Sequence, residues 1–301
     1  MSRVDLFGNE EKITLYIVGN GFDLHHDIPS RYSDFQNYLN ANHHAYLAGQ
    51  IEIFYPSIVN SPEYKWGDLE NALGEIDFKA TYAECNSDVE IDYDHMMRSA
   101  AILEDNPQQI LAEALDELHA LFEEWVHSID ISSEKDNALY NFNTEGLFLN
   151  FNYTETLEEL YSVPRSAITY IHGRRGRDEE LILGHCVEID PANAYLEENA
   201  IYEDDGYKGI IEVANAQRKN VDEIIASHKK FWEAITTVNR VIVYGHSLSE
   251  VDIPYFHMIF HSIAENAEWH FGCHTKKDKE KASSLISQLG INEERCYCFN
   301  F

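Results

Sequence analysis

Short apolar runs rich in β-branched and aromatic residues recur along the chain and alternate with stretches of helical spacing. The first run, Ile13 to Val18, has the composition of a strand buried on both faces. Later runs of this kind cover residues 146–154, 167–171, 181–183, 240–244, 269–272 and 296–299. Strands that alternate with helices form a parallel, doubly wound sheet. The pattern therefore predicts an α/β fold with a mostly parallel, Rossmann-like sheet within a single domain, residues 1–301.

A long helical region separates the first predicted strand from the second. Between Asp92 and Ser128, apolar residues recur every three or four positions, and acids occupy the other face. Residues 32–145 are too long for an ordinary crossover, so we predict a mainly helical insertion. It would roof a nucleotide cleft or make an oligomer contact, and the sequence does not decide between them. Residues 185–220 are predicted to be an acidic surface excursion or lid, largely irregular from Glu188 onward.

The first strand runs directly into Gly19-Asn20-Gly21. Two glycines one residue apart allow a tight turn and a close approach to the backbone, which is the first half of a phosphate-binding turn. The third glycine of that motif is missing, because Leu24 occupies its position. A glycine turn of an ordinary α/β domain is the alternative interpretation.

Polar residues follow three further strands at the point where each ends. Asn152 and His172 come after the second and third strands, and Gly245-His246-Ser247 follows the run at 240–244. The carboxyl ends of parallel strands meet at one edge of a sheet, so these groups are expected to share a crevice with the glycine turn. Taken singly, Asn152 is also typical of a turn and His172 of a structural histidine.

Two helix starts are predicted nearby. Thr154 is a suitable N-cap for a helix over residues 155–161. Ser249 and Asp252 have the spacing of a capping box for the helix that follows the run at 240–244.

The charge composition limits the kinds of partner that the protein is expected to bind. The chain has 22 basic and 53 acidic residues, a net charge of −31, which disfavours nucleic acid and anionic membranes. Simple solubility also explains this charge. No apolar signal region and no run of about 18 apolar residues occurs, so a cytoplasmic protein is expected.

Metal and disulfide chemistry are not expected. The five cysteines contain no C-x-x-C pair, which argues against a structural zinc site or a disulfide framework. The histidines at 25, 26, 43 and 44 are interpreted as solvated residues, because no paired cysteine or glutamate stands at ligand spacing.

The motifs together resemble the AbiH family of bacterial phage-defence (abortive infection) proteins. The segments that carry this resemblance are LYIVGNGFDLHHDIP, WGDLE, FLNFNYTETLEELY, YIHG, LILGH and VYGHSLSEVDIPYF. AbiH proteins are in turn remotely similar to sirtuin-like NAD hydrolases. Asn152-Tyr153 and His172-Gly173 match that second pattern, and Ile28-Pro29 followed by Arg31 resembles its first nucleotide loop. Thr154 replaces an aspartate of the pattern, and the four-cysteine zinc module of sirtuin deacylases is absent, so deacylation is not expected.

The resemblance implies an anti-phage protein that hydrolyses the nicotinamide–ribose bond of NAD, without a metal. In that hypothesis Asn152 binds the ribose or the attacking water, and His172 is the base. The expected cofactor-binding residues are Gly19, Asn20, Gly21 and Phe22 for the diphosphate, Asp23 for a ribose hydroxyl, Arg31, and Gly245, His246 and Ser247 for the adenosine side.

Two other classes stay open. One is a regulatory or sensing module that binds NAD or ADP-ribose without turnover, which Thr154 and Asp23 favour. The other is a nuclease or toxin effector, against which the net charge of −31 counts. The expected partners are a nucleotide and either a second copy of the chain or a defence-system protein.

Overall fold

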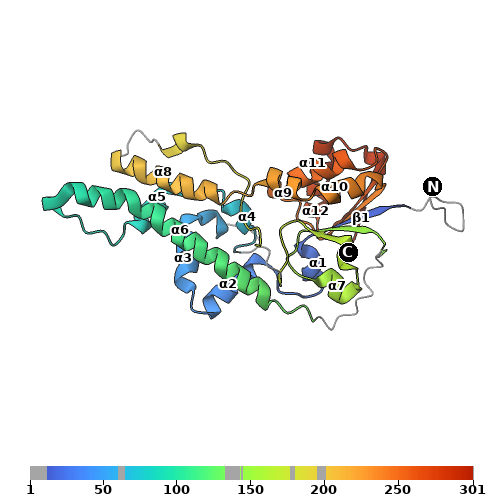
Figure 1. The fold of residues 1–301 in the computed structure, drawn as a ribbon, viewed down its shortest axis with the longest axis horizontal. Coiled ribbons are helices and arrows are strands. Elements are labelled where there is room, and N and C mark those ends of the chain that lie inside the picture. The colour runs from blue at the N-terminus through green and yellow to red at the C-terminus, as the bar shows by residue number, and fades with distance from the viewer. Residues whose placement is uncertain are drawn as a thin grey trace, which may run out of the picture. The chain divides into compact units, whose positions relative to one another are not determined.

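The computed structural model describes residues 12–59, 65–132, 143, 145–176, 180–194 and 201–300, apart from the side chains of 201–203. The chain divides into two compact units (Figure 1). The first, the α/β unit, comprises residues 1–30, 129–181 and 221–301. The second, the helical unit, comprises residues 31–128 and 182–220.

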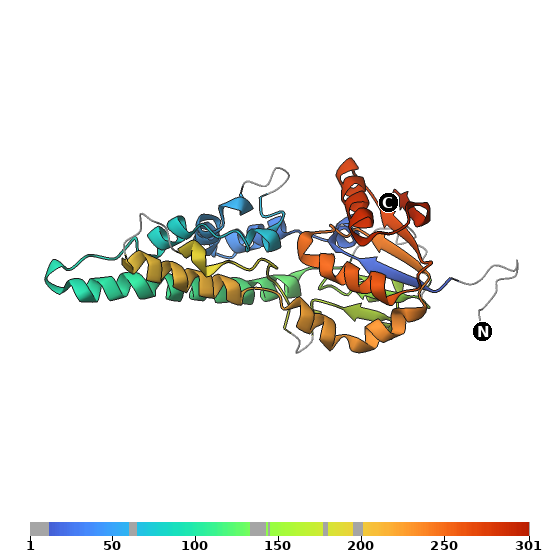
Figure 2. The same cartoon turned by 90° about the horizontal axis from the view of Figure 1, so that it is seen from above.

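The α/β unit is built on a six-stranded sheet whose strand pairs are all parallel, in the order β3-β2-β1-β4-β5-β6. Helices flank it on both sides (Figure 2). This confirms the predicted Rossmann-like fold. The strands are β1 Thr14–Val18, β2 Leu147–Asn150, β3 Ile168–Tyr170, β4 Arg240–Tyr244, β5 Glu268–Gly272 and β6 Cys296–Phe299. The run expected at 181–183 forms no strand, and the next residues pair only through an isolated bridge between His185 and Arg218.

The first strand lies at the centre of the sheet. All five residues of β1 are buried, as expected for a strand with neighbours on both sides and cover on both faces. Val18 is in register with Asn150 of β2 and with Tyr244 of β4. The three strands therefore end level with one another, and the loops that follow them emerge at the same edge.

Short helices connect the strands. Their bounds are α1 Asn20–His25, α7 Thr156–Tyr161, α9 Val221–Ser227, α10 Lys229–Ala234, α11 Ile253–Ser262 and α12 Lys276–Leu289, with 3-10 turns η4 Arg165–Ala167, η6 Ile235–Thr237, η7 Glu250–Asp252 and η8 Glu293–Arg295. His228 separates α9 from α10, because its backbone precedes α10 in a non-helical conformation.

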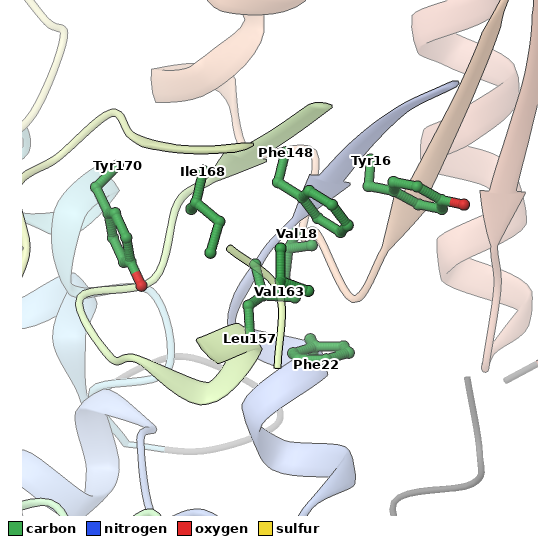
Figure 3. Packing of buried hydrophobic residues seen from close by; sticks show 8 residues of the cluster. All are labelled: Tyr16, Val18, Phe22, Phe148, Leu157, Val163, Ile168 and Tyr170. Atoms are coloured by element: carbon green, nitrogen blue, oxygen red, sulfur yellow. The ribbon is translucent and has the colours of Figure 1, made fainter. Parts of the chain in front are cut away.

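One face of β1, β2 and β3 packs against α1 and α7. Figure 3 shows this core cluster: Tyr16, Val18, Phe22, Phe148, Leu157, Val163, Ile168 and Tyr170. Tyr16 stacks on Phe148 with ring centroids 4.8 Å apart. Removing such side chains from water stabilises the fold by about 1.5–3 kcal/mol each. The packing fixes α1, and with it the direction in which the glycine turn leaves β1.

The helical unit is dominated by α6 Met96–Ser128, which packs along α8 Ile201–Ala216. The other elements are α2 Tyr32–Ala41, α3 Ala45–Phe54, α4 Leu69–Ala72, α5 Phe78–Cys85, and the 3-10 turns η1 Pro56–Ile58, η2 Tyr93–His95 and η5 Pro191–Ala194. An aromatic group made by Phe35, Trp66, Phe122 and Trp125 forms part of its core. Helices therefore form where the insertion was predicted.

The expectation of irregular structure after Glu188 was wrong for α8. Its buried residues recur at helical spacing, but Gly206 and Gly209 and the many acids concealed that pattern. Both glycines serve close packing instead. A Cβ on Gly206 would lie 2.6 Å from the Tyr82 ring, and one on Gly209 would lie 2.9 Å from Gln108 Cβ.

The loops after β1 and β4 meet through their backbones. Gly19 N donates to Tyr244 O at 3.0 Å, and Gly21 N donates to Gly245 O at 2.7 Å. A Cβ on Gly245 would lie 2.2 Å from Phe22 N. The φ of Gly245 is +61°, a backbone conformation that residues with a side chain rarely adopt. The glycine motif therefore serves contact between two loops of the protein.

We predict that Gly245→Ala destabilises the protein by more than about 4 kcal/mol, because backbone overlap adds to strain. Gly290→Ala is the matched control, since its φ is +69° but nothing lies within 4 Å of an added Cβ. Strain alone should cost the control about 1–2 kcal/mol. Urea denaturation of both variants checks this, and equal losses would contradict the contact.

Candidate functional site

The carboxyl edge of the sheet brings together most of the residues predicted from the sequence. Asn152 lies two residues beyond β2, His172 two beyond β3, and His246 two beyond β4. The glycine turn follows β1 at the same edge. These groups are up to 227 positions apart in the sequence (residues 19 and 246), so the level strand ends are what gather them.

A carboxylate stands between two of the histidines. Asp252 Oδ1 lies 3.8 Å from His172 Nε2, and Asp252 Oδ2 lies 3.4 Å from His246 Nε2. The side chains of Asp252, His172 and His246 are 9%, 4% and 2% exposed, respectively. These separations exceed those of ordinary hydrogen bonds. The arrangement can orient both imidazoles and stabilise a positive charge that develops on either of them.

Asp252 is a site residue that was not predicted from the sequence. The expected capping box was wrong, because Ser249 makes no side-chain capping bond and Asp252 faces the histidines. An acid six residues after His246, at the entry to the next helix, was the available signal. The same acid fits the spacing of a capping box equally well.

The tautomer of His246 follows from its surroundings. Leu248 N donates to His246 Nδ1 at 2.9 Å, so the neutral ring carries its proton on Nε2, which faces Asp252. Leu248 adopts a left-handed φ of +50°. Lys281 Nζ from α12 donates to Ser247 O at 2.8 Å and braces the same turn. Ser247 itself is exposed.

The ring of Phe151 contacts both histidines. Phe151 presents its ring at 5.4 Å from His172 and 4.4 Å from His246, measured between centroids, in edge-to-face geometry. Tyr255 packs against Phe151 at 5.6 Å and His172 at 5.7 Å. These apolar surroundings strengthen electrostatic interactions between the histidines and Asp252.

Asn152 ties the end of β2 to the glycine turn. Its Nδ2 donates to Gly19 O at 3.2 Å, and its backbone N donates to Asn150 Oδ1 at 2.9 Å. Part of its hydrogen-bonding capacity is therefore used to hold the turn.

Asp23 is fully buried beside this turn. Its Oδ2 accepts a hydrogen bond from Thr154 Oγ1 at 2.5 Å, and Thr156 Oγ1 lies 3.2 Å from Thr154 Oγ1. Burial raises the pKa of Asp23 to about 6, and the polar side chains around it offset only part of that rise. The expectation that Thr154 caps the following helix was wrong: Glu155 is at the N-cap of α7.

Most of the backbone amides expected to bind a diphosphate already donate hydrogen bonds to carbonyl groups of the protein. Gly19, Gly21 and Phe22 donate their N–H groups to Tyr244, Gly245 and Gly19 carbonyls. Within the described residues, only the Asn20 N–H of these four has no acceptor. The side chain of Asn20 pairs with Ser30, and that of Phe22 lies in the core.

Arg31 belongs to the helical unit rather than the α/β unit. Its backbone N donates to Asp34 Oδ2 at 2.9 Å at the start of α2, and the residue is exposed. Its assignment to the cofactor site stays a prediction.

No group of three or more histidines, cysteines or acids suited to a metal ion occurs among the described residues. His26 is buried rather than solvated, and its ring bonds to Phe22 O at 2.7 Å and Tyr161 Oη at 2.6 Å. In the part of the chain that the structure describes, no helix is long and apolar enough to cross a membrane.

A comparison with protein families places this edge in context. The family model described as bacteriophage abortive infection AbiH matches residues 15–272. The chain belongs to the AbiH family. Every site residue discussed above except Lys281 lies within the matched range. Membership in AbiH supports a role in abortive infection, the defence against phage. No curated protein and no solved structure matches the chain.

We predict that Asp23→Asn stabilises this AbiH protein at pH 7.5. A carboxyl whose folded pKa is about 6 instead of 3.8 destabilises the fold increasingly as the pH rises from 4 to 6. Above that range the cost is about 3 kcal/mol, which the uncharged amide removes. Chemical denaturation at pH 4 and pH 7.5 measures the gain, which should disappear at pH 4.

Asp130→Asn is the control for this prediction. That carboxyl is exposed, and hydrogen bonds from Ser132 lower its pKa. Its loss should not stabilise the protein at either pH. A stabilisation by Asp23→Asn that is equal at both pH values would contradict the buried charge.

Proposed function

We propose that this AbiH protein acts in abortive infection by hydrolysing the nicotinamide–ribose bond of NAD. The observation that carries the proposal is the placement of His172, Asp252 and His246 at the carboxyl edge of a 3-2-1-4-5-6 sheet. Dinucleotides bind at this edge in such sheets, where the direction of the connections reverses between β1 and β4. A buried group of titratable residues there is typical of an active site.

The chemistry needs a base more than an acid. Cleavage of the nicotinamide–ribose bond passes through an oxocarbenium-like transition state, as glycoside hydrolysis does. Nicotinamide departs with the bonding electrons and becomes neutral, while water attacks the anomeric carbon and loses a proton. In the proposal His172 accepts that proton, and Asp252 stabilises the imidazolium that forms.

The surrounding residues position the ligand. Asn152 Oδ1 is the atom proposed to contact the ribose or the attacking water, because Nδ2 already bonds to Gly19 O. Asp23 is assigned a ribose hydroxyl, with Thr154 holding its other oxygen. Gly19 to Phe22 are assigned the diphosphate, with Asn20 N–H as its main-chain donor. The turn at Gly245, His246 and Ser247 is assigned the adenosine side.

Binding of NAD or ADP-ribose without turnover is the second candidate. The observation that favours it is the internal use of three of the four glycine-turn amides and of the Asn152 amide. A site held this firmly by its own hydrogen bonds suits recognition as well as catalysis. Calorimetry that shows binding, together with no release of nicotinamide, would favour this candidate.

We predict that His172→Ala lowers NAD hydrolysis by about 10²- to 10⁴-fold, the usual contribution of a positioned base. Asp252→Asn should give a loss of similar order, because the amide no longer stabilises the imidazolium. Asn152→Ala should also reduce turnover. Free nicotinamide is measured with purified protein, and loss of cellular NAD is measured in phage-infected bacteria, where the defence is triggered.

His261→Ala is the matched control, because this exposed histidine lies on α11 outside the site. It should leave hydrolysis unchanged. Equal turnover in the wild type, the control and the His172 and Asp252 variants would reject the assignment. If the protein protects infected cells while the NAD in those cells stays intact, NAD hydrolysis itself is rejected.

A further inference from the structure

An unusually apolar surface lies where α5 connects to α6. Residues 90–98 are all exposed, and we call residues 90–97 the α6 tip. Its large apolar side chains are Ile91, Tyr93, Met96 and Met97, which are 47%, 80%, 55% and 87% exposed. The tip lies at the left end of α6 in Figures 1 and 2. Single exposed apolar residues need no explanation, but four within seven positions indicate a contact surface.

Hydrogen bonds within the segment hold the tip in one conformation. The Asp92 side chain accepts from Asp94 N at 2.9 Å and bonds to His95 Nδ1 at 2.9 Å. Asp92 N donates to Ser99 Oγ at 2.9 Å, and Ser99 is buried in the first turns of α6. The apolar side chains are therefore displayed by an ordered turn, which lowers the entropy cost of binding.

The charged residues around these side chains are almost all acidic. Asp88, Glu90, Asp92 and Asp94 are exposed and alternate with the apolar positions, while Arg98 is the only lysine or arginine between 88 and 98. The whole chain carries a charge of −31. A second copy of the chain and an anionic membrane would both be repelled by this surface, whereas a basic partner would be attracted to it.

We propose that the α6 tip is the docking surface for a basic protein whose apolar side chains are flanked by lysine or arginine. Tyr93 and the two methionines would supply the apolar contact, since methionine adapts to varied partners. The flanking acids would supply steering and orientation. The tip shares no residue with the proposed NAD site, and its test does not depend on enzymatic activity.

The test uses a synthetic amphipathic helix with leucine on one face and lysine on the other as the probe. Fluorescence anisotropy should show binding to the wild-type protein that weakens as salt rises. Replacing Ile91, Tyr93, Met96 and Met97 by serine should weaken binding by at least about tenfold, because the contact loses its apolar core. Glu90→Lys with Asp94→Lys should weaken it similarly.

Tyr46→Ser is the matched control. Tyr46 belongs to the same unit and is 74% exposed, but it lies outside the tip. It should bind the probe as the wild type does, and thermal melting should show all variants folded. Equal affinity of the tip and control variants, or no binding by the wild type, would overturn the proposal. So would a wild-type dimer in sedimentation that the tip variant loses, or binding of the tip to anionic phosphatidylserine vesicles.

Discussion

The site depends on the backbone contact between the loop after β1 and the loop after β4. The Gly21 N–H bonds to the Gly245 carbonyl at 2.7 Å, and a side chain at either glycine would meet backbone atoms within 3 Å. This contact joins the two strands at which the sheet order changes direction. His246 follows Gly245 directly, so the contact also sets the place of one imidazole beside Asp252. Glycine is needed here because the protein packs against itself, before any ligand is considered.

Two buried carboxylates mark the same edge, and their surroundings differ. Asp23 is held by threonine hydroxyls, which do not carry a compensating charge, so burial raises its pKa to about 6. Asp252 instead lies between two imidazoles, which can become positively charged. Burying carboxylates works against stability, and proteins retain such groups mainly where they serve a function. This energetic cost supports a functional edge independently of any resemblance to known enzymes.

Much of the fold was predictable because burial on both faces leaves a clear mark on strand composition. The run at β1, where all five residues are buried, needed only its β-branched and aromatic residues to be recognised. Parallel pairing then placed Asn152, His172 and His246 at one edge without further information. Asp252 could not be found this way, because the same residue suits a helix cap and the choice depends on tertiary contacts. The helix α8 was missed because Gly206 and Gly209 reduce helix propensity but allow close packing.

The segments that carry the AbiH resemblance form two separate groups, one within each unit. The glycine turn and the turns that contain Asn152, His172 and His246 meet in the α/β unit. In the helical unit, WGDLE and LILGH are joined through Lys219, whose Nζ lies 2.5 Å from Glu70 Oε1 and whose N donates to His185 O at 2.8 Å. The Lys219 side chain is fully buried, so loss of either charge would leave the other without compensation in the interior. The ion pair between Lys219 and Glu70 therefore specifies how residues 182–220 pack against residues 31–128. A buried ion pair of this kind adds little net stability but favours one packing arrangement over others. The motifs of a family matched over residues 15–272 thus build two polar centres, one in each unit.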